Sequence, residues 1–148
     1  MQHFLLIKRD ALTRAGLPID AAQSALLLLN ARIWPLWRGT PNRLRVVAGD
    51  EVAVYLAGAK ESRVIAHVAV ERVGPWTRDL AKAYPLSLDG EPVSVLHLSA
   101  AQILQHRVDV RSLLPRLSFV RPGIKKWGVY FTGGMRAVPA GDFALLTH

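Results

Sequence analysis

Cysteine is absent from the sequence of 148 residues. This absence excludes disulfide bonds, thiolate zinc sites, iron–sulfur clusters and cysteine nucleophiles. A chain of this length can bury roughly 70% of its unfolded surface as one domain, without a disulfide or a metal ion to stabilise it. We therefore expect a single domain over residues 1–148, and a cytoplasmic location.

Long apolar runs are also missing. An apolar run such as residues 25–29 is far shorter than the roughly 18 residues that a transmembrane helix needs. The opening residues, MQHFLLIKRD, lack the charged and then apolar order of a signal peptide. We expect a soluble protein that has no membrane partner.

The sequence lacks the common catalytic and phosphate-binding motifs G-x-S-x-G, H-E-x-x-H, G-x-x-x-x-G-K and G-x-G-x-x-G. The five histidines are scattered without the spacing of metal ligands. Asp50 and Glu51 are adjacent and would face opposite sides of a strand, which argues against a pair of catalytic carboxylates. We expect a binding protein rather than an enzyme, with no cofactor and no metal site.

Positive charge is abundant instead. Nineteen Lys and Arg residues against eleven Asp and Glu residues give a formal net charge of +8, which favours a polyanionic partner. Two basic segments that contain tryptophan, residues 31–49 and 114–141, hold no acidic residue, whereas residues 50–109 mix both signs. The alternative is that the arginines reflect genome composition or solubility and not a binding partner.

The C-terminal basic segment interleaves aromatic residues with cations, an arrangement that suits nucleic acid because cations pair with phosphate and rings stack on bases. In WGVYF, however, Trp127, Val129 and Phe131 alternate at period two. This pattern predicts a strand with one buried face, so we interpret Trp127 as a core residue. Tyr130 would face the other way.

Hydrophobic alternation and turn residues predict a mixed α/β (α+β) domain, with about six strands in a small, strongly bent sheet or barrel and short helices around it. The expected strands cover residues 3–8, 51–56, 64–71, 92–99, 117–120, 127–131 and 135–138, with a polar connection at 57–62. The expected helices cover residues 20–30, with Asp20 as N-cap, 109–114, with Asp109 as N-cap, and a last turn within 139–147.

Three tryptophans lie where regular structure is not expected. Pro35, Gly39 and Pro41 predict irregular backbone around Trp34 and Trp37. Trp76 follows a Gly-Pro pair at the end of an expected strand, a position from which side chains often line sites.

These segments, read in order, resemble a known family. FLLIKRD, a helix, IWPLW, the GDEVAVYLAG hairpin and AHVAVERVGPW resemble the EVE domains and their relatives, the YTH domains, of the PUA-like superfamily. The final part, LPRLSFVRPGIKKWGVYFTGGMRAVPAGDFALL, is similar to the ending of stand-alone EVE proteins. The resemblance covers nearly the whole chain and implies a PUA-like bent β-barrel.

The resemblance also implies a function. EVE proteins resemble readers that accept a flipped, modified base in an aromatic pocket, often a methylated or hydroxymethylated cytosine or a methyladenine in DNA, and many are linked to restriction nucleases. Such a pocket would be formed by Trp34, Trp76, Asp10, Trp37 and Tyr55. Phosphates would be bound by Lys8, Arg32, Arg38, Arg121, Lys125 and Lys126. The alternatives are a PUA-type RNA-binding protein without specificity for modified bases, and a binder of a small nucleotide-like ligand.

Overall fold

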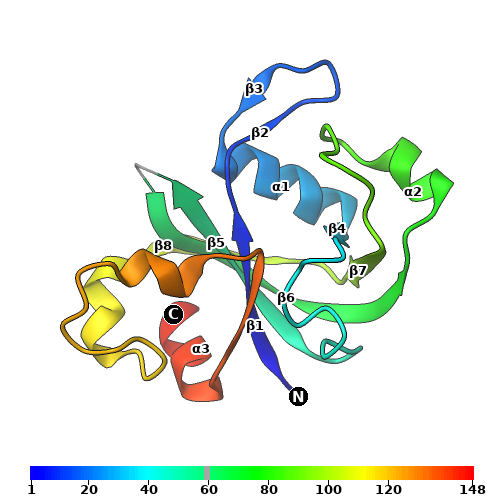
Figure 1. Cartoon of the computed structure of the whole chain (residues 1–148). Helices are drawn as coiled ribbons and strands as arrows, with labels where there is room; N and C mark the ends of the chain where they lie inside the picture. The colour runs from blue at the N-terminus through cyan, green and yellow to red at the C-terminus, as the bar shows by residue number, and fades with distance from the viewer. Residues whose placement is uncertain (59–60) are drawn as a thin grey trace.

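The computed structural model describes residues 1–58 and 61–148, in which a bent sheet lies between two groups of short helices (Figure 1). The strands of the sheet are β1 (His3–Lys8), β4 (Ile33–Leu36), β5 (Glu51–Gly58), β6 (Glu61–Pro75), β7 (Ser94–Leu98), β8 (Gln102–Asp109) and β9 (Met135–Val138). Their order is β4-β7-β6-β5-β1-β9, and β8 pairs with β6 off this path. A separate hairpin consists of β2 (Ala11–Leu12) and β3 (Pro18–Ile19).

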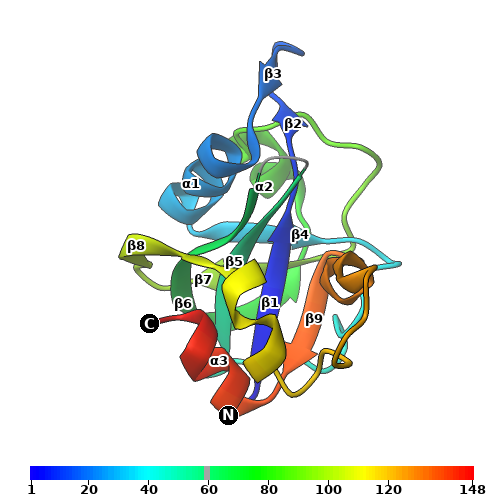
Figure 2. The ribbon, with the colours of Figure 1, turned by 90° about the vertical axis from the view of Figure 1, so that its left-hand side faces the viewer.

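Helices cover both faces of the sheet. α1 (Ala21–Ala31) packs on one face, and α2 (Arg78–Ala83) lies near it. The 3-10 helices η1 (Val110–Arg116) and η2 (Trp127–Phe131), together with α3 (Ala140–Leu146), cover the opposite face (Figure 2). We call these the α1 face and the α3 face. None of the helices within the described residues has the length and hydropathy of a transmembrane segment.

The alternation of β5 separates two hydrophobic cores. Val52, Val54 and Leu56 belong to the core on the α1 face, whereas Ala53 and Tyr55 belong to the core on the α3 face. Successive side chains of a strand point to opposite faces, so a strand buried on both sides feeds two cores. The predicted hairpin of β5 and β6 is confirmed, although residues 59 and 60 of the expected connection lie outside the described residues.

β6 bends the sheet. Its first half pairs with β5 and β8, and its last residues pair with β7 after a register shift between Val70 and Arg72. Such irregularities increase the local twist and bend of a strand. The terminal strands β4 and β9 do not pair with each other in the described part of the chain. The expected strongly bent α+β sheet is thus confirmed, and it remains open rather than closing into a barrel.

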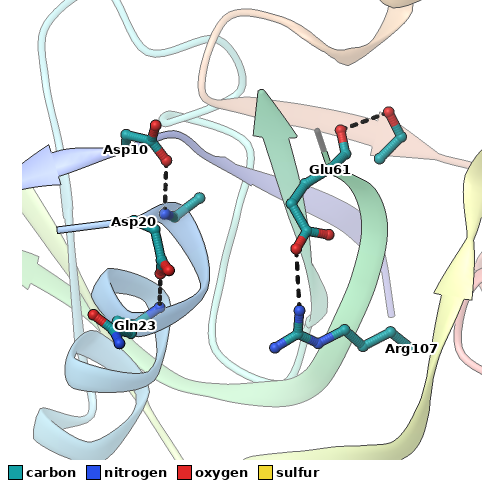
Figure 3. Close-up of polar contacts among 7 residues, drawn as sticks. Asp10, Asp20, Gln23, Glu61 and Arg107 are labelled. Carbon is teal, nitrogen blue, oxygen red and sulfur yellow. Dashed lines mark hydrogen bonds and ion pairs between the residues drawn. The ribbon is translucent and has the colours of Figure 1, made fainter. Parts of the chain in front are cut away.

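Both predicted N-caps are confirmed. The Asp20 carboxylate accepts a hydrogen bond from the Gln23 backbone N–H at 2.8 Å (Figure 3), and the Asp109 carboxylate accepts one from the Arg111 N–H at 3.0 Å. In each case the acid satisfies a donor of the first turn that has no partner within the helix.

Three expectations are wrong. The segment around Trp34 is the buried strand β4, because a proline is tolerated in an edge strand, where its missing N–H need not meet a neighbour. Residues 127–131 form η2 instead of a strand: Trp127 and Tyr130, three residues apart, both pack on the α3 face, and Val129 is 59% exposed. Residues 117–120 form a turn, and β8 was not expected.

Two buried carboxylates attach loops to this framework. Asp142 accepts hydrogen bonds from the Ser118 N–H, the Ser118 hydroxyl and the Phe119 N–H, at 2.8–3.2 Å. Asp50 accepts from the Gln2 N–H at 2.8 Å and the Val47 N–H at 2.9 Å. Burial alone would raise the pKa of Asp50, but these hydrogen bonds outweigh it and hold the pKa below its ordinary value.

Candidate functional site

Two adjoining hollows lie on the α1 face. The smaller, of about 130 Å³, is bordered by β4 and Gly134, and the larger, of about 460 Å³, by residues 10–12 and 86–89. Lys8, Trp37 and Tyr84 line both hollows, so the two lie next to each other. We call them together the aromatic pocket, and its chemistry-bearing lining residues are Lys8, Asp10, Trp34, Trp37, Thr40, Tyr84 and Asp89.

β1 delivers Lys8 to the pocket. Phe4 and Leu6 face the α1 core, and Lys8 is next on the same face of the strand. The Lys8 Nζ donates a hydrogen bond to the backbone carbonyl of Arg9 at 3.0 Å. Burial lowers the pKa of Lys8, and the nearby Asp10 carboxylate offsets part of this effect. An anionic or acceptor group in the pocket would restore the contacts that this ammonium has lost with water.

β4 and the turn after it place two tryptophans. Trp34 is only 5% exposed and is both a core residue and a wall of the smaller hollow. The turn is closed by the Trp37 N–H, which donates to the Thr40 hydroxyl at 2.9 Å, and by the Thr40 N–H, which donates to the Trp37 carbonyl at 3.0 Å. The expected irregular backbone is therefore confined to the turn that begins at Trp37.

The indole Nε1 of Trp37 is buried and has no hydrogen-bond partner among the described residues. A buried donor without a partner costs about 1–3 kcal/mol. Trp37 lines both hollows, and a shift of its indole that brought Nε1 to an acceptor on a ligand would remove this cost. A Cβ added to Gly90 by substitution would lie 3.9 Å from this nitrogen.

Tyr84 lines both hollows, and sequence reasoning missed it. It is 4% exposed, and burial raises its pKa to about 12. Its hydroxyl therefore keeps its proton at neutral pH. The only signal in the sequence is a tyrosine directly before Pro85, after the short helix α2. The Trp76 ring packs edge-on against Tyr84, with ring centroids 5.8 Å apart. Trp76 thus supports the pocket through Tyr84 and does not line it.

Asp10 lies at the rim of the larger hollow. One of its carboxylate oxygens accepts a hydrogen bond from the Ala21 N–H at 2.9 Å, which fixes the side chain at the start of α1 (Figure 3). No hydrogen bond from the described residues reaches the other oxygen. Asp10 is exposed, so this oxygen is available to a ligand.

Tyr55 is separated from the other predicted pocket residues. It is 3% exposed in the core of the α3 face, where its ring stacks on Phe131 with centroids 4.8 Å apart. The reason is the alternation of β5, in which Val54 and Leu56 face α1 and Tyr55 faces away. The structure therefore brings together Lys8, Asp10, Trp34 and Trp37 and leaves Tyr55 out.

The expected phosphate-binding cations do not form one cluster. Lys8 lines the pocket, and the exposed Arg38 directly follows Trp37. Arg32, at the C-terminal cap of α1, borders a different groove with Leu26 and Ile103. Arg121 borders a small hollow on the α3 face beside Trp127, and Lys125 and Lys126 are exposed on the loop before η2.

Nearly all charged side chains of the described residues lack an ion-pair partner among those residues. The ion pair found there joins Arg107 Nη1 to Glu61 Oε1 at 3.2 Å (Figure 3). The described residues contain no group of three or more His, Asp and Glu side chains that could hold a metal ion. The arrangement offers an aromatic pocket whose edges carry Lys8, Asp10 and Asp89, and it suits binding of a planar, polar ligand.

No protein-family model and no curated protein sequence matches the chain. Solved structures do. The human THYN1 protein in complex with DNA that contains 5-methylcytosine has a TM-score of 0.62 and 13% identity, over 99% of this chain and 96% of that one. The ASCH protein of Zymomonas mobilis has a TM-score of 0.59 and 10% identity, over 98% and 93% of the two chains.

The N-terminal domain of McrB from Staphylothermus marinus is similar as well, with a TM-score of 0.56 and 10% identity, over 97% of this chain and 92% of that one. At such low identities the likeness is one of fold, and it extends over nearly the full length of both chains in each case. The chain therefore has the PUA-like fold that its resemblance to EVE proteins implied.

Proposed function

We propose that this protein is a non-catalytic nucleic-acid-binding module that reads a modified base in DNA, a methylated or hydroxymethylated cytosine or a methyladenine, flipped into the aromatic pocket. The observation that carries this proposal is the pocket itself, in which Trp34, Trp37 and Tyr84 supply rings and the Trp37 Nε1 has no partner. A nucleobase has flat faces for the rings and acceptors for the indole donor.

The energies are compatible with base flipping. Extruding a base costs a few kcal/mol, and stacking on an aromatic side chain contributes about 1–3 kcal/mol per base. A buried methyl group adds roughly 0.8 kcal/mol, which favours a methylated base over its unmodified counterpart. The free oxygen of Asp10 and the Lys8 ammonium supply an acceptor and a donor for the edge of the base.

The structural neighbours support the same reading. Human THYN1 was solved with 5-methylcytosine DNA, and its fold matches this chain from end to end. A partnership with a restriction nuclease is the further part of the proposal, and it is based on the resemblance to EVE proteins and on the likeness to the McrB domain.

Nonspecific affinity would come from the cations. Arg38 beside the pocket is the first candidate, and Arg32, Arg121, Lys125 and Lys126 would reach flanking phosphates only if the nucleic acid wraps around the domain. Four phosphate contacts would give a slope of log affinity against log salt of roughly −4 on duplex DNA.

The test is a binding panel of one oligonucleotide sequence, prepared as DNA and as RNA, each unmodified or with methylated or hydroxymethylated bases. We expect the modified DNA to bind most tightly, and Trp37→Ala to lower the ratio of modified to unmodified affinity about tenfold. Trp127→Ala is the matched control, because it removes a partly buried tryptophan on the α3 face and should leave that ratio unchanged.

The ratio of modified to unmodified affinity decides between the candidate functions. A ratio near one in the parent protein, together with tighter binding of RNA, would instead establish the PUA-type RNA-binding alternative. Absence of any binding at low salt would remove the nucleic-acid proposal and leave the small nucleotide-like ligand.

A further inference from the structure

A second groove lies on the α3 face, away from the aromatic pocket. Its volume is about 670 Å³, larger than either hollow of the pocket. Residues 104–108 of β8 form one side of the groove, and η1 and α3 form the others. Figure 2 shows how these elements are arranged. We call it the β8 groove.

The groove combines an apolar floor with a basic rim. Leu104, Val108, Leu113 and Leu145 are partly buried and pack against the core of the α3 face. The rim is formed by His106, Arg107, Arg116 and His148, and no Asp or Glu belongs to the lining. This combination fits a ligand that carries both apolar groups and carboxylates.

β8 is shaped to expose this surface. Val108 pairs with Val64 and Ile103 pairs with Ala66, so residues 104–107 of β8 stand opposite the single residue Ile65 of β6. This bulge turns β8 away from the regular ladder. Within the described residues β8 pairs only with β6, so its other edge has no partner strand and can receive an extended segment.

One rim arginine is already engaged and the other is free. Arg107 pairs with Glu61 at 3.2 Å, and its side chain is 40% exposed. Arg116, the last residue of η1, is exposed and forms no ion pair within the described part of the chain. A planar guanidinium without a partner is well suited to bind a carboxylate with two parallel hydrogen bonds.

We propose that the β8 groove binds an extended acidic segment of a partner protein, with apolar side chains on the floor and a carboxylate against Arg116. A second copy of this chain is disfavoured, because two molecules of net charge +8 repel each other. Nucleic acid is disfavoured by the four apolar residues of the floor, against which a phosphate backbone would gain nothing. Because the groove and the pocket lie on opposite faces, both can be occupied at once.

The proposal can be tested by selection from a displayed library of random short peptides on the intact protein. We expect enrichment of peptides that alternate Asp or Glu with Leu, Ile or Val. A synthetic copy of an enriched peptide should shift the backbone amide resonances of residues 104–108, 112–114, 116 and 144–148, and leave those of the aromatic pocket in place.

Charge reversal at the free arginine is the discriminating variant. Arg116→Glu should weaken the peptide about tenfold, since it replaces attraction by repulsion. Arg78→Glu changes the charge by the same amount on α2, outside the groove, and should change peptide affinity less than about twofold. Neither variant removes a buried side chain, so both should melt like the parent.

Three results would overturn the proposal. The first is a selection that enriches basic peptides or no common pattern. The second is a set of shifted resonances outside the groove. The third is a loss of oligonucleotide affinity in Arg116→Glu that exceeds its loss of peptide affinity, which would make the groove part of the nucleic-acid surface. The oligonucleotide binding panel does not depend on any of these three results. The proposal of a peptide site can therefore be refuted without refuting the proposal of a base-binding pocket.

Discussion

On the α3 face, Phe131 is surrounded by rings: Tyr55 stacks on it at 4.8 Å, and Phe119 and Trp127 meet it edge-on at 5.7 Å. On the α1 face, Trp34 and Trp37 border open space. The polar groups follow the same division. Asp142 on the α3 face has hydrogen bonds to both oxygens, whereas the Trp37 Nε1 on the α1 face has none.

The comparison shows which aromatic residues serve stability and which are available to a ligand. Rings that pack against one another contribute to the stability of the fold. Rings with an unpacked face, or with a donor that has no partner, are free to contribute to binding. Arg136 is a case of the first kind on the α3 face: its Nε is buried without a hydrogen bond, but its guanidinium lies 4.8 Å from the Phe119 ring and 5.3 Å from the Tyr130 ring.

The largest effect on stability is expected from a substitution in the ring cluster around Phe131. Phe131 is only 2% exposed and lies among three rings. Phe131→Ala would leave a cavity there and should lower the free energy of unfolding by about 3–5 kcal/mol. Urea denaturation measures this change. Trp37→Ala should cost less than half as much in the same experiment. Equal losses would contradict the division between the faces.

The second effect concerns the carboxylate of the α3 face. Asp142→Ala should cost about 2–3 kcal/mol, because the N–H groups of Ser118 and Phe119 lose their acceptor. Asp10→Ala on the other face removes a single hydrogen bond to Ala21 and should cost about 1 kcal/mol. Thermal melts of the two variants side by side provide the measurement, and the reverse order would refute this prediction.

A smaller effect isolates the unused donor. Trp37→Phe keeps an aromatic ring and removes Nε1, so stability should stay within about 0.5 kcal/mol of the parent or rise. Affinity for the modified oligonucleotide should fall about fivefold, since one hydrogen bond is lost. If affinity is unchanged, Nε1 does not meet the ligand, and the pocket recognises shape alone.

The smallest effect is a dependence on pH. Burial raises the pKa of Tyr84 to about 12, above the ordinary value near 10 of the unfolded chain. The folded state then holds the proton more firmly, so this stabilisation is complete below pH 10 and is lost as pH rises toward 12. Burial also raises the pKa of Tyr55, so ultraviolet titration of tyrosinate should show late transitions for two tyrosines, and Tyr84→Phe should remove one of them. A transition near pH 10 for every tyrosine would mean that Tyr84 is solvated.

Much of this molecule could be predicted from local patterns. β1, α1 with its Asp20 cap, the β5–β6 hairpin, β9 and α3 all have clear periodicity or turn residues. The strand β4 was not predicted, because Pro35 indicates a break in regular structure unless the strand is known to lie at the edge of a sheet. The 3-10 helix η2 was not predicted, because a pattern of five residues is too short to distinguish the alternation of a strand from a 3-10 helix.

The site was harder to predict than the fold. Trp34 and Trp37 stood out because tryptophan is rare, but Tyr84 joins them only through tertiary packing that no local signal encodes. Tyr55 was expected among the pocket residues and lies on the α3 face, because alternation shows that a strand has two sides and does not say which side meets α1. The face assignment needs the long-range contacts of the folded chain.

Pro35 has one more consequence, for behaviour at high concentration. β4 is a terminal strand of buried, apolar residues, and if local opening uncovers its edge, another molecule can add a strand there and start an aggregate. A proline in the middle of the edge has no N–H to donate, so an incoming strand meets a gap in its hydrogen-bond ladder. Copies of the chain crowded together would therefore be protected from fusing through the strand that carries Trp34.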